Sequence, residues 1–307
     1  MSAPVPSSRQ RRRRLRRGPE PVVILGTLKR LGLCVLVGVA TCFGRPSASE
    51  SAALHAPSIT TPEAIVVDAW SGGVLYAKNP DVERYPASTV KIMTALIVLK
   101  RHIPLGRVVA VSPFAASFLG STAGLYAGER MSIWNLLHGL LLPSGNDAAI
   151  ALAEAIAGSE AAFVRLMNRQ AARLHLRHTH YLSPNGFDQW GQVTTARDLA
   201  TLARVAMHRA TFRAVTDQRY WTAWSADRRI EHQWTSLNRL LWLSPHVDGV
   251  KTGTTPGAGA CLVSSAHLGG KWVIAVNMDD TENDRFHDGM ALLNYGLAVD
   301  AAPASTD

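Results

Sequence analysis

The order in which strand-like and helix-like segments follow one another is the strongest constraint on how this chain can fold. Two short apolar runs in residues 64–79 are separated by a Ser-Gly-Gly turn, a pattern that predicts a β-hairpin. Three further strand patterns lie late in the chain, at 247–253, 259–268 and 271–279. One compact arrangement pairs these terminal strands in a single antiparallel sheet with helices packed around it. This is the fold that we predict.

Helical patterns fill most of the chain between the two groups of strands, and one more follows the last strand. The expected helices cover 85–101, 131–142, 146–158, 159–176, 195–209 and 285–299. Ser132, Ser159 and Thr195 stand where an N-cap is expected, Asp198 lies three residues after Thr195 as in a capping box, and Gly158 is a typical helix end. Residues rich in Gly, Pro and Ser at 104–128 are expected to be irregular.

Positive charge is concentrated at the start of the chain. The formal net charge is +9, and nine Lys and Arg against one Glu fall within residues 1–30, so the rest of the chain is almost neutral. A protein that binds nucleic acid usually carries its positive charge on one face of its folded domain. The charge distribution therefore argues against a nucleic-acid partner.

The basic leader continues into fourteen uncharged, mostly apolar residues at 31–44. A helix that spans a bilayer needs about 20 apolar residues, so this run is short for that purpose. A basic segment, a short apolar core and then small residues are typical of a secretory signal, which could be cleaved after Ala48 or Ala53. Three alternatives remain, namely an anchor that is not cleaved, a cytosolic tail and a lipoprotein cleavage box that ends at Cys42.

The cysteine content is compatible with export. Cys34 and Cys42 lie in the leader, so a mature protein would keep only Cys261 and could form no internal disulfide. An exported domain with a full hydrophobic core does not need one. Cys261 is expected to be a buried strand residue.

The first turn of the predicted helix at 85–101 carries a Ser-x-x-Lys pattern, formed by Ser88 and Lys91. Residues three apart share one face of a helix, so the hydroxyl and the amine can meet. A serine hydroxyl needs a base to become a nucleophile. A lysine serves as that base only when burial or a nearby cation keeps it neutral. By itself the pattern is better explained by a capping serine and a surface lysine, because Ser-x-x-Lys is common by chance.

Two further short patterns contain groups that suit a peptide ligand. Ser144 and Asn146 lie on a turn after a buried helix, where the hydroxyl can relay a proton and the amide can hold a carbonyl, although Asn146 is also a good N-cap. Lys251 and Thr252 lie on a predicted strand, where a cation and a hydroxyl suit a carboxylate. Gly253 then lets a substrate backbone come close.

Together the three patterns match, in order, the signature set of penicillin-binding proteins and class A β-lactamases. Over residues 61–299 the chain resembles the serine D-alanyl-D-alanine carboxypeptidases, the low-molecular-weight penicillin-binding proteins. The segments "LSPNGFD", "VTTARDLATLA" and "AGACLVSSA" also look like this family. The resemblance implies an α/β fold of the penicillin-binding-protein/β-lactamase-like transpeptidase type. In that fold an antiparallel sheet is flanked by helices, an all-helical subdomain lies beside it, and the active site is at their boundary.

The resemblance also implies a role for each site residue. Ser88 would be the acyl-enzyme nucleophile, Lys91 its general base and Ser144 a proton relay, with no metal and no cofactor. The residues implied in substrate binding are Asn146, Lys251, Thr252, Gly253, Thr254 and Arg285. The oxyanion hole would use the backbone N–H groups of Ser88 and Thr254. The substrate would be the D-Ala-D-Ala end of a peptidoglycan stem peptide, and penicillins would acylate Ser88.

The sequence departs from the family pattern in three places. The middle motif is Ser-Gly-Asn, which suits the carboxypeptidase branch better than the Ser-Asp-Asn of many β-lactamases. Thr254 stands where several relatives carry His. The β-rich C-terminal domain and amphipathic anchor of many relatives are missing. We therefore expect a leader at 1–48, a linker at 49–60, a D,D-peptidase domain at 61–299 and a tail at 300–307, with membrane attachment only through an uncleaved leader.

Several other functions remain as alternatives. A D,D-endopeptidase or transpeptidase would use the same residues on peptidoglycan cross-links. A class A β-lactamase needs a Glu to activate water, and the best candidate stretch offers only Asp188. A non-catalytic sensor would be expected to lack Ser88 or Lys91. His175, His178 and His180 are spaced poorly for a metal site on one helical face. The expected location is the periplasm or the outer face of the cytoplasmic membrane.

Overall fold

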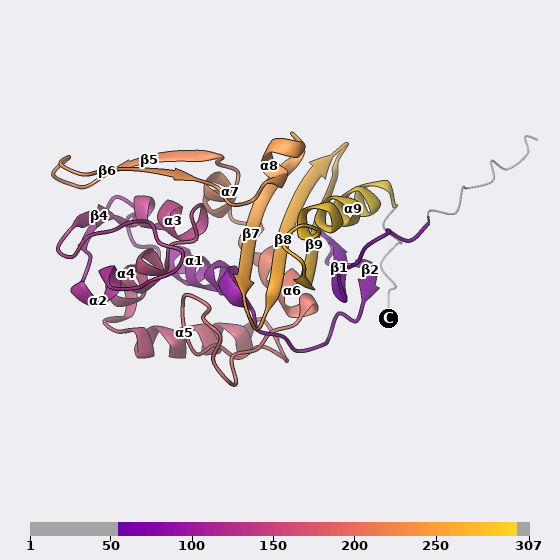
Figure 1. Cartoon of the computed structure of the whole chain (residues 1–307), viewed down its shortest axis with the longest axis horizontal. Coiled ribbons are helices and arrows are strands. Elements are labelled where there is room, and N and C mark those ends of the chain that lie inside the picture. Colours follow the sequence, from indigo (N-terminus) through magenta and orange to yellow (C-terminus); the bar gives the residue numbers. More distant parts are fainter. Residues whose placement is uncertain (1–54, 300–307) are drawn as a thin grey trace, which may run out of the picture. The chain divides into compact units, whose positions relative to one another are not determined.

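The computed structural model describes residues 55–299, so the predicted leader, the first part of the linker and the tail lie outside the described residues. A five-stranded sheet with the order β2-β1-β9-β8-β7 forms one side of this part of the chain (Figure 1). The strands are β1 (Glu63–Asp68), β2 (Val74–Lys78), β7 (Val247–Thr255), β8 (Gly259–Leu268) and β9 (Lys271–Asp280). Every neighbouring pair is antiparallel. The predicted pairing of the terminal strands is confirmed.

Successive side chains of the strands point alternately to the two faces of the sheet, and the apolar ones belong to two separate hydrophobic cores. On β1, Ala64 and Val66 belong to a smaller cluster that includes Leu292 and Leu293 of α9 (Arg285–Ala298). The side chains between them on β1 point to the opposite face and join a larger cluster with the helices there. Successive strand residues face opposite sides of a sheet, so helices on both faces bury β1, β8 and β9 almost completely, whereas the edge strand β2 stays partly exposed. The site therefore rests on a sheet that is held from both sides.

Six helices cover the larger core, and all but α7 were predicted from the sequence. They are α1 (Lys91–Lys100), α3 (Ile133–Leu141), α4 (Asn146–Ala157), α5 (Glu160–Arg173), α6 (Ala196–Met207) and α7 (Ala210–Thr216). Residues 91–98 of α1 are all buried, as expected for a helix enclosed on every side. The side chains of Ser132, Ser159 and Thr195 accept N-terminal N–H groups, and Gly158 ends α4 with φ +78°. These predicted caps are confirmed.

Two capping roles that the sequence left open as alternatives are not found in the structure. Ser88 lies inside a 3-10 turn, η1 (Ala87–Val90), that leads into α1, and no side chain caps this turn. Gly145 is the N-cap of α4, and Asn146 is its first helical residue. In both cases the side chain takes part in contacts across the site instead. The capping box of α6 is also incomplete, because the Asp198 carboxylate accepts from His178 N and Thr179 Oγ1 of a neighbouring loop.

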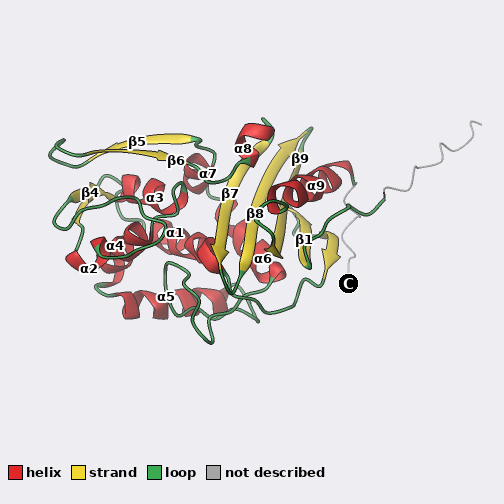
Figure 2. Ribbon diagram, in the orientation of Figure 1, coloured by secondary structure: helices red, strands yellow, loops and turns green. Residues whose placement is uncertain are grey.

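Several short elements were not predicted. Residues 104–128 contain β3 (Val108–Ala110), which pairs with β4 (Arg130–Ser132), and the four-residue α2 (Pro113–Ala116). A second hairpin consists of β5 (Tyr220–Trp224) and β6 (Glu231–Thr235), followed by α8 (Leu240–Leu243). These elements are too short, and the hairpin too exposed, to leave a clear period in the sequence. Figure 2 shows the β5–β6 hairpin lying over the helical part, away from the five-stranded sheet.

The tryptophans of this hairpin pack on the helical part. The rings of Trp221 and of Trp134 in α3 pack edge to face. The Trp234 indole N–H donates to Ala123 O (2.8 Å). Within residues 55–299 no helix has the length and apolarity needed to cross a bilayer.

Candidate active site

The Ser88 side chain lies where the helical part meets the sheet. The first backbone hydrogen bond of η1 is donated by Thr89 N to Pro86 O (3.2 Å). The N–H of Ser88 lies one residue earlier, so it takes no part in the hydrogen bonds of the turn. N–H groups at a helix start have no intrahelical acceptor. Ala87, just before Ser88, has φ +47°, a conformation that is costly for a residue with a Cβ. The backbone thus presents both the Ser88 hydroxyl and its N–H outward.

Lys91 is fully buried directly beneath Ser88. Its Nζ lies 2.9 Å from Ser88 Oγ, 2.8 Å from Asn146 Oδ1 and 2.8 Å from the Asn185 carbonyl oxygen. None of these three atoms carries a charge. Burial lowers the pKa of the Lys91 amine well below its ordinary value, the Lys251 ammonium lowers this pKa further, and Asp147 opposes the shift. The site therefore favours a neutral amine next to a serine hydroxyl.

The turn between α3 and α4 supplies the second pair of predicted residues. Ser144 has φ +65°, and its buried Oγ has no hydrogen-bond partner within the described residues. A buried hydroxyl without a partner is costly, which is typical of a group reserved for a ligand or a proton. Asn146 accepts from Lys91 through its Oδ1 and donates from Nδ2 to Leu119 O (2.9 Å). Asn146 thus links the lysine to the loop that borders the site.

Strand β7 passes along the other side of Ser88. A Cβ at Gly253 would lie 3.0 Å from Ser88 N, so this position lets the strand approach the nucleophile closely. Lys251 is 1% exposed and donates from Nζ to Thr252 O (2.8 Å). Burial and the nearby Arg285 guanidinium lower the pKa of Lys251 to about 7. Lys251 and Thr252 are thus placed on the strand as the sequence predicted.

Arg285 lies at the end of β7, beside the site. It is the first residue of α9, and its Nη1 donates to Thr254 Oγ1 (2.6 Å) and to Gly253 O (3.4 Å). The guanidinium therefore fixes the end of β7 next to Ser88. The predicted residues from η1, α1, α4, β7 and α9 converge on one place.

The loop before α6 contributes two residues that were not predicted. Asn185 offers its carbonyl to Lys91, and Gly186 lies directly against Ala87. Gly186 has φ +93°, and a Cβ there would be 2.0 Å from the Ala87 carbonyl oxygen. Only glycine satisfies both conditions. The segment "LSPNGFD" contains these residues, and its Asn-Gly pair was the signal for a turn with positive φ.

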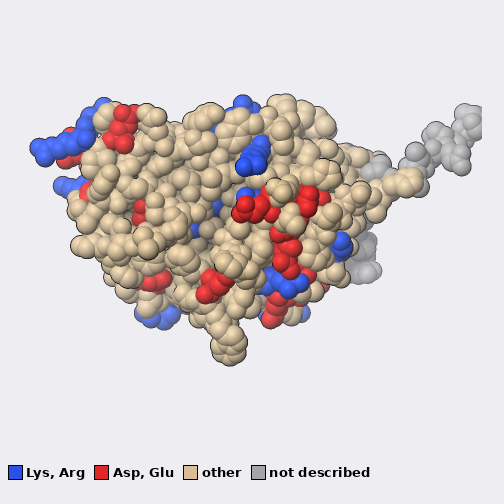
Figure 3. Space-filling view, viewed as in Figure 1, with Lys and Arg blue, Asp and Glu red and all other residues tan. Residues whose placement is uncertain are grey.

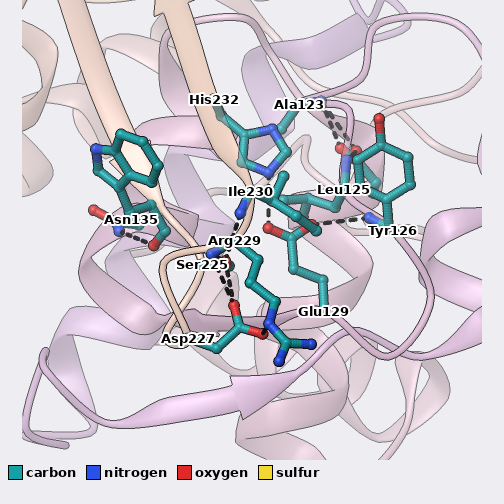
Figure 4. A network of polar contacts seen from close by, with 12 residues as sticks. Ala123, Leu125, Tyr126, Glu129, Asn135, Ser225, Asp227, Arg229, Ile230 and His232 are labelled. Carbon is teal, nitrogen blue, oxygen red and sulfur yellow. Dashed lines mark hydrogen bonds and ion pairs between the residues drawn. The ribbon is translucent and has the colours of Figure 1, made fainter.

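A second set of unpredicted residues holds the opposite wall of the site. The Asp147 carboxylate accepts the backbone N–H groups of Ala123 (2.8 Å) and Leu125 (3.0 Å). Figure 4 shows the neighbouring network, in which Glu129 accepts from Tyr126 N (3.0 Å) and lies 2.7 Å from His232 Nε2. The β5–β6 hairpin thereby supports the loop that carries Leu119 and Ser121 beside Asn146.

A cavity of about 240 Å³ opens above Ser88. Its lining comes from Ser88, Gly120, Ser121, Asn146, Asn185, Gly186, Phe187, Thr254, Thr255 and Pro256. It runs along the end of β7 and beneath the 119–121 loop. A peptide in extended conformation could lie here beside the strand, with a carbonyl carbon close to Ser88 Oγ.

The other candidates from the sequence have different surroundings. The oxygens of Asp188 accept from Thr255 Oγ1 (2.6 Å) and Gly257 N (2.8 Å). His178 faces Glu83 at 3.2 Å. Cys261 is buried on β8, as predicted, and burial raises the pKa of its thiol to about 12. Among residues 55–299 no three His, Cys, Asp or Glu side chains come together in an arrangement that could hold a metal ion.

Comparisons with known proteins identify the family of this chain. A family model for D-alanyl-D-alanine carboxypeptidases, the S11 peptidases, matches residues 50–282. The D-alanyl-D-alanine carboxypeptidase of a Streptomyces strain is 34% identical over 302 residues, which cover 93% of this chain and all of that protein. The Bacillus subtilis D-alanyl-D-alanine carboxypeptidase DacF is 35% identical over 81% of this chain, but the match spans only 66% of the Bacillus protein.

The fold of this chain is also similar to those of solved D,D-peptidase structures. The Streptomyces K15 DD-transpeptidase has a TM-score of 0.76 at 34% identity, and the match covers 80% of this chain and all of that one. The D-alanyl-D-alanine carboxypeptidase DacD from Francisella tularensis has a TM-score of 0.74 at 31% identity, covering 80% of this chain and 73% of that one. The fold expected from the resemblance is confirmed.

The close contact between Gly186 and Ala87 yields a prediction. Gly186→Ala should displace the turn that carries Ser88, lower the free energy of unfolding by about 3 kcal/mol and remove labelling by a fluorescent penicillin. Gly191→Ala is the matched control, since Gly191 has φ +91° but only a side-chain carbon at 3.9 Å. Its cost should be about 1–2 kcal/mol, from conformation alone. Denaturant unfolding and labelling of both variants test this, and equal effects of the two substitutions would contradict it.

Proposed function

The chain belongs to the D-alanyl-D-alanine carboxypeptidase family of serine peptidases, and we propose that it removes the terminal D-alanine from peptidoglycan stem peptides through an acyl-enzyme on Ser88. The observation that carries this proposal is the buried Lys91 amine 2.9 Å from Ser88 Oγ. A general base must lie within hydrogen-bond reach of the proton that it removes.

The partners of Lys91 support its role as the base. Asn146 Oδ1 and the Asn185 carbonyl oxygen can only accept hydrogen bonds, so they take the two N–H groups of a neutral amine. The lone pair of the amine is then left for the Ser88 hydroxyl, which can donate. This arrangement favours transfer of the Ser88 proton to Lys91 as Oγ attacks the acyl carbon.

The remaining groups surround the reacting carbonyl. The N–H groups of Ser88 and Thr254 bind the oxyanion, and Ser144 passes a proton from Lys91 to the leaving D-alanine nitrogen. The terminal carboxylate binds to the Lys251 ammonium and the Thr252 hydroxyl. Asn146 positions the peptide, Gly253 allows its backbone to approach, and Arg285 holds Thr254. Water then hydrolyses the acyl-enzyme, and the shortened peptide leaves.

Penicillins carry a carboxylate and a reactive amide, and we propose that they acylate Ser88 in the same way. Peptidoglycan lies outside the cytoplasmic membrane, which agrees with the basic and apolar leader at 1–44 as an export signal. On this proposal the enzyme acts in the periplasm or at the outer face of that membrane.

A β-lactamase function has less support. Class A enzymes use a carboxylate to activate the water that releases the acyl group. Asp188 was the best candidate for that task, and both of its oxygens are engaged by Thr255 and Gly257. A penicilloyl group on Ser88 is therefore expected to be long-lived.

Release of D-alanine from a synthetic pentapeptide tests the proposal. Ser88→Ala should lower the rate by at least about a thousand-fold, because the nucleophile is lost while the binding groups remain. Ser117→Ala, which removes an exposed hydroxyl that donates to Phe114 O (2.8 Å) at the end of α2, should leave the rate unchanged. Residual activity of Ser88→Ala near the wild-type level would refute the nucleophile. Faster cleavage of cross-linked dimers, or transfer to an added amine, would identify an endopeptidase or a transpeptidase instead.

The titration of Lys251 yields a prediction on pH. Lys251 must be protonated to bind the carboxylate, and its pKa is lowered to about 7, so kcat/KM should fall as the pH rises through about 7. At low pH, kcat/KM should fall again as Lys91 becomes protonated. Lys251→Arg keeps its charge and should move the alkaline limb up by roughly one pH unit or more. If the alkaline limb of the kcat/KM profile lies at the same pH in the wild type and in Lys251→Arg, protonated Lys251 is not the group that binds the carboxylate.

A further inference from the structure

A cavity of about 320 Å³ lies where the end of α1 packs on α5. Its polar lining consists of Lys100 and Arg101 at the end of α1 and of Arg169, Gln170 and Arg173 on α5. Lys91 begins the same helix α1 nine residues before Lys100, so the cavity is about 14 Å from Lys91 along the helix axis. The mechanism above makes no use of this cavity.

The charged side chains of the cavity are all cationic. Its lining contains a lysine and three arginines and no carboxylate. Within residues 55–299 none of these four cations forms an ion pair with an Asp or a Glu. Burial lowers the pKa of Lys100, and the charges of Arg209 and Arg173 lower this pKa further. The cavity therefore carries an uncompensated positive charge that attracts an anion.

The sequence of α5 brings three of its arginines together on one helix face. Arg165, Arg169 and Arg173 are spaced four residues apart, and like charges at this spacing destabilise a helix. A helix C-terminus favours cations in its last turn, which accounts for Arg173 but not for the whole row. Figure 3 shows Lys and Arg side chains at the lower left edge of the molecule, where Figure 1 places α5. A bound anion would offset this repulsion.

An independent sign of a ligand is the Gln170 side chain, which is only 4% exposed. Its Oε1 accepts from Lys100 Nζ (2.9 Å), and this contact orients the amide. Its Nε2 is buried and has no hydrogen-bond acceptor within the described residues. A buried donor without an acceptor is costly. An anionic oxygen held between Lys100 and the arginines would accept from this N–H group.

We infer that this cavity is an anion-binding site whose ligand is a phosphate or diphosphate ester group. A guanidinium matches the oxygens of a phosphate with two parallel hydrogen bonds. A phosphate ester carries up to about two negative charges, so it neutralises four cations better than a carboxylate does. The anion and the stem peptide bind at opposite ends of α1. The site is therefore independent of the proposed release of D-alanine.

Protection of Lys100 from acetylation tests the site in the full chain, with pyrophosphate as the probe. The protein is treated with acetic anhydride, and the modified lysines are quantified by peptide mapping. Saturating pyrophosphate should slow acetylation of Lys100 at least five-fold. Lys78, a half-buried lysine on β2, is the matched control and should react at an unchanged rate. The measurement is specific to Lys100, so pyrophosphate bound by the basic residues at 1–30 does not affect it.

Three substitutions locate the binding groups. Arg173→Gln should raise the pyrophosphate concentration that gives half-protection about ten-fold, because a hydrogen bond between charged groups is lost. Gln170→Glu keeps the shape of the side chain but places a carboxylate beside Lys100, so it should abolish protection. Arg165→Gln makes the same charge change on α5 outside the cavity lining and should keep wild-type protection. All three variants should be labelled by a fluorescent penicillin at the wild-type rate.

Vesicles identify the source of the phosphate group. Stronger protection of Lys100 by vesicles that contain phosphatidylglycerol than by pyrophosphate would assign the group to a lipid headgroup. Protection by pyrophosphate alone would assign it to a soluble or polymer-borne ester. No protection by either, equal protection of Lys78, or wild-type protection in Arg173→Gln and Gln170→Glu would overturn the inference. Penicillin labelling of Ser88 in the same samples shows separately whether the proposed active site functions.

Discussion

The structure depends most on a lysine amine that is buried without a counterion. The Lys91 amine hydrogen-bonds to neutral oxygens of Ser88, Asn146 and Asn185. The neighbouring cation that lowers its pKa is Lys251. Burying a charged ammonium in such a place is costly, so the neutral form is favoured. The elements around Lys91, namely the enclosed helix α1, the start of α4 and the loop before α6, each supply part of this environment. Packing of several elements of the core is thus needed to keep Lys91 neutral, as a general base must be.

Strained backbone conformations at the site also depend on the packing of the surrounding elements. Ala87 and Ser144 both have positive φ, and each is a residue with a Cβ that flanks or supplies a reactive hydroxyl. Such conformations cost about 1–3 kcal/mol each and persist only where the surrounding packing enforces them. The sheet, covered on both faces, and the contact between Gly186 and Ala87 provide that packing. The Asp147 and Glu129 networks hold the opposite wall in the same manner.

Much of this arrangement could be predicted from the sequence, because the strands and long helices have clear periods and the three motifs stand in a fixed order. The single antiparallel sheet of the terminal strands followed from these periods, and the resemblance carried by the motifs implied that Ser88, Lys91 and Lys251 share one site. The β5–β6 hairpin could not be predicted, since its exposed strands have no continuous apolar face. Asn185 was missed because it acts through its backbone carbonyl, which any residue type carries. The alternative capping role of Asn146 is not found, because Gly145 is the N-cap of α4 and the Asn146 amide oxygen accepts from Lys91.

The most direct test of the central claim is the location of the covalent bond. The protein is treated with benzylpenicillin, its intact mass is measured, and the modified residue is then identified by peptide mapping. The account predicts one added penicilloyl group per chain, on Ser88, and none when Lys91 is replaced by methionine, which keeps the bulk of the side chain but removes the base. A bond at any other residue, or undiminished acylation of Lys91→Met, would contradict it.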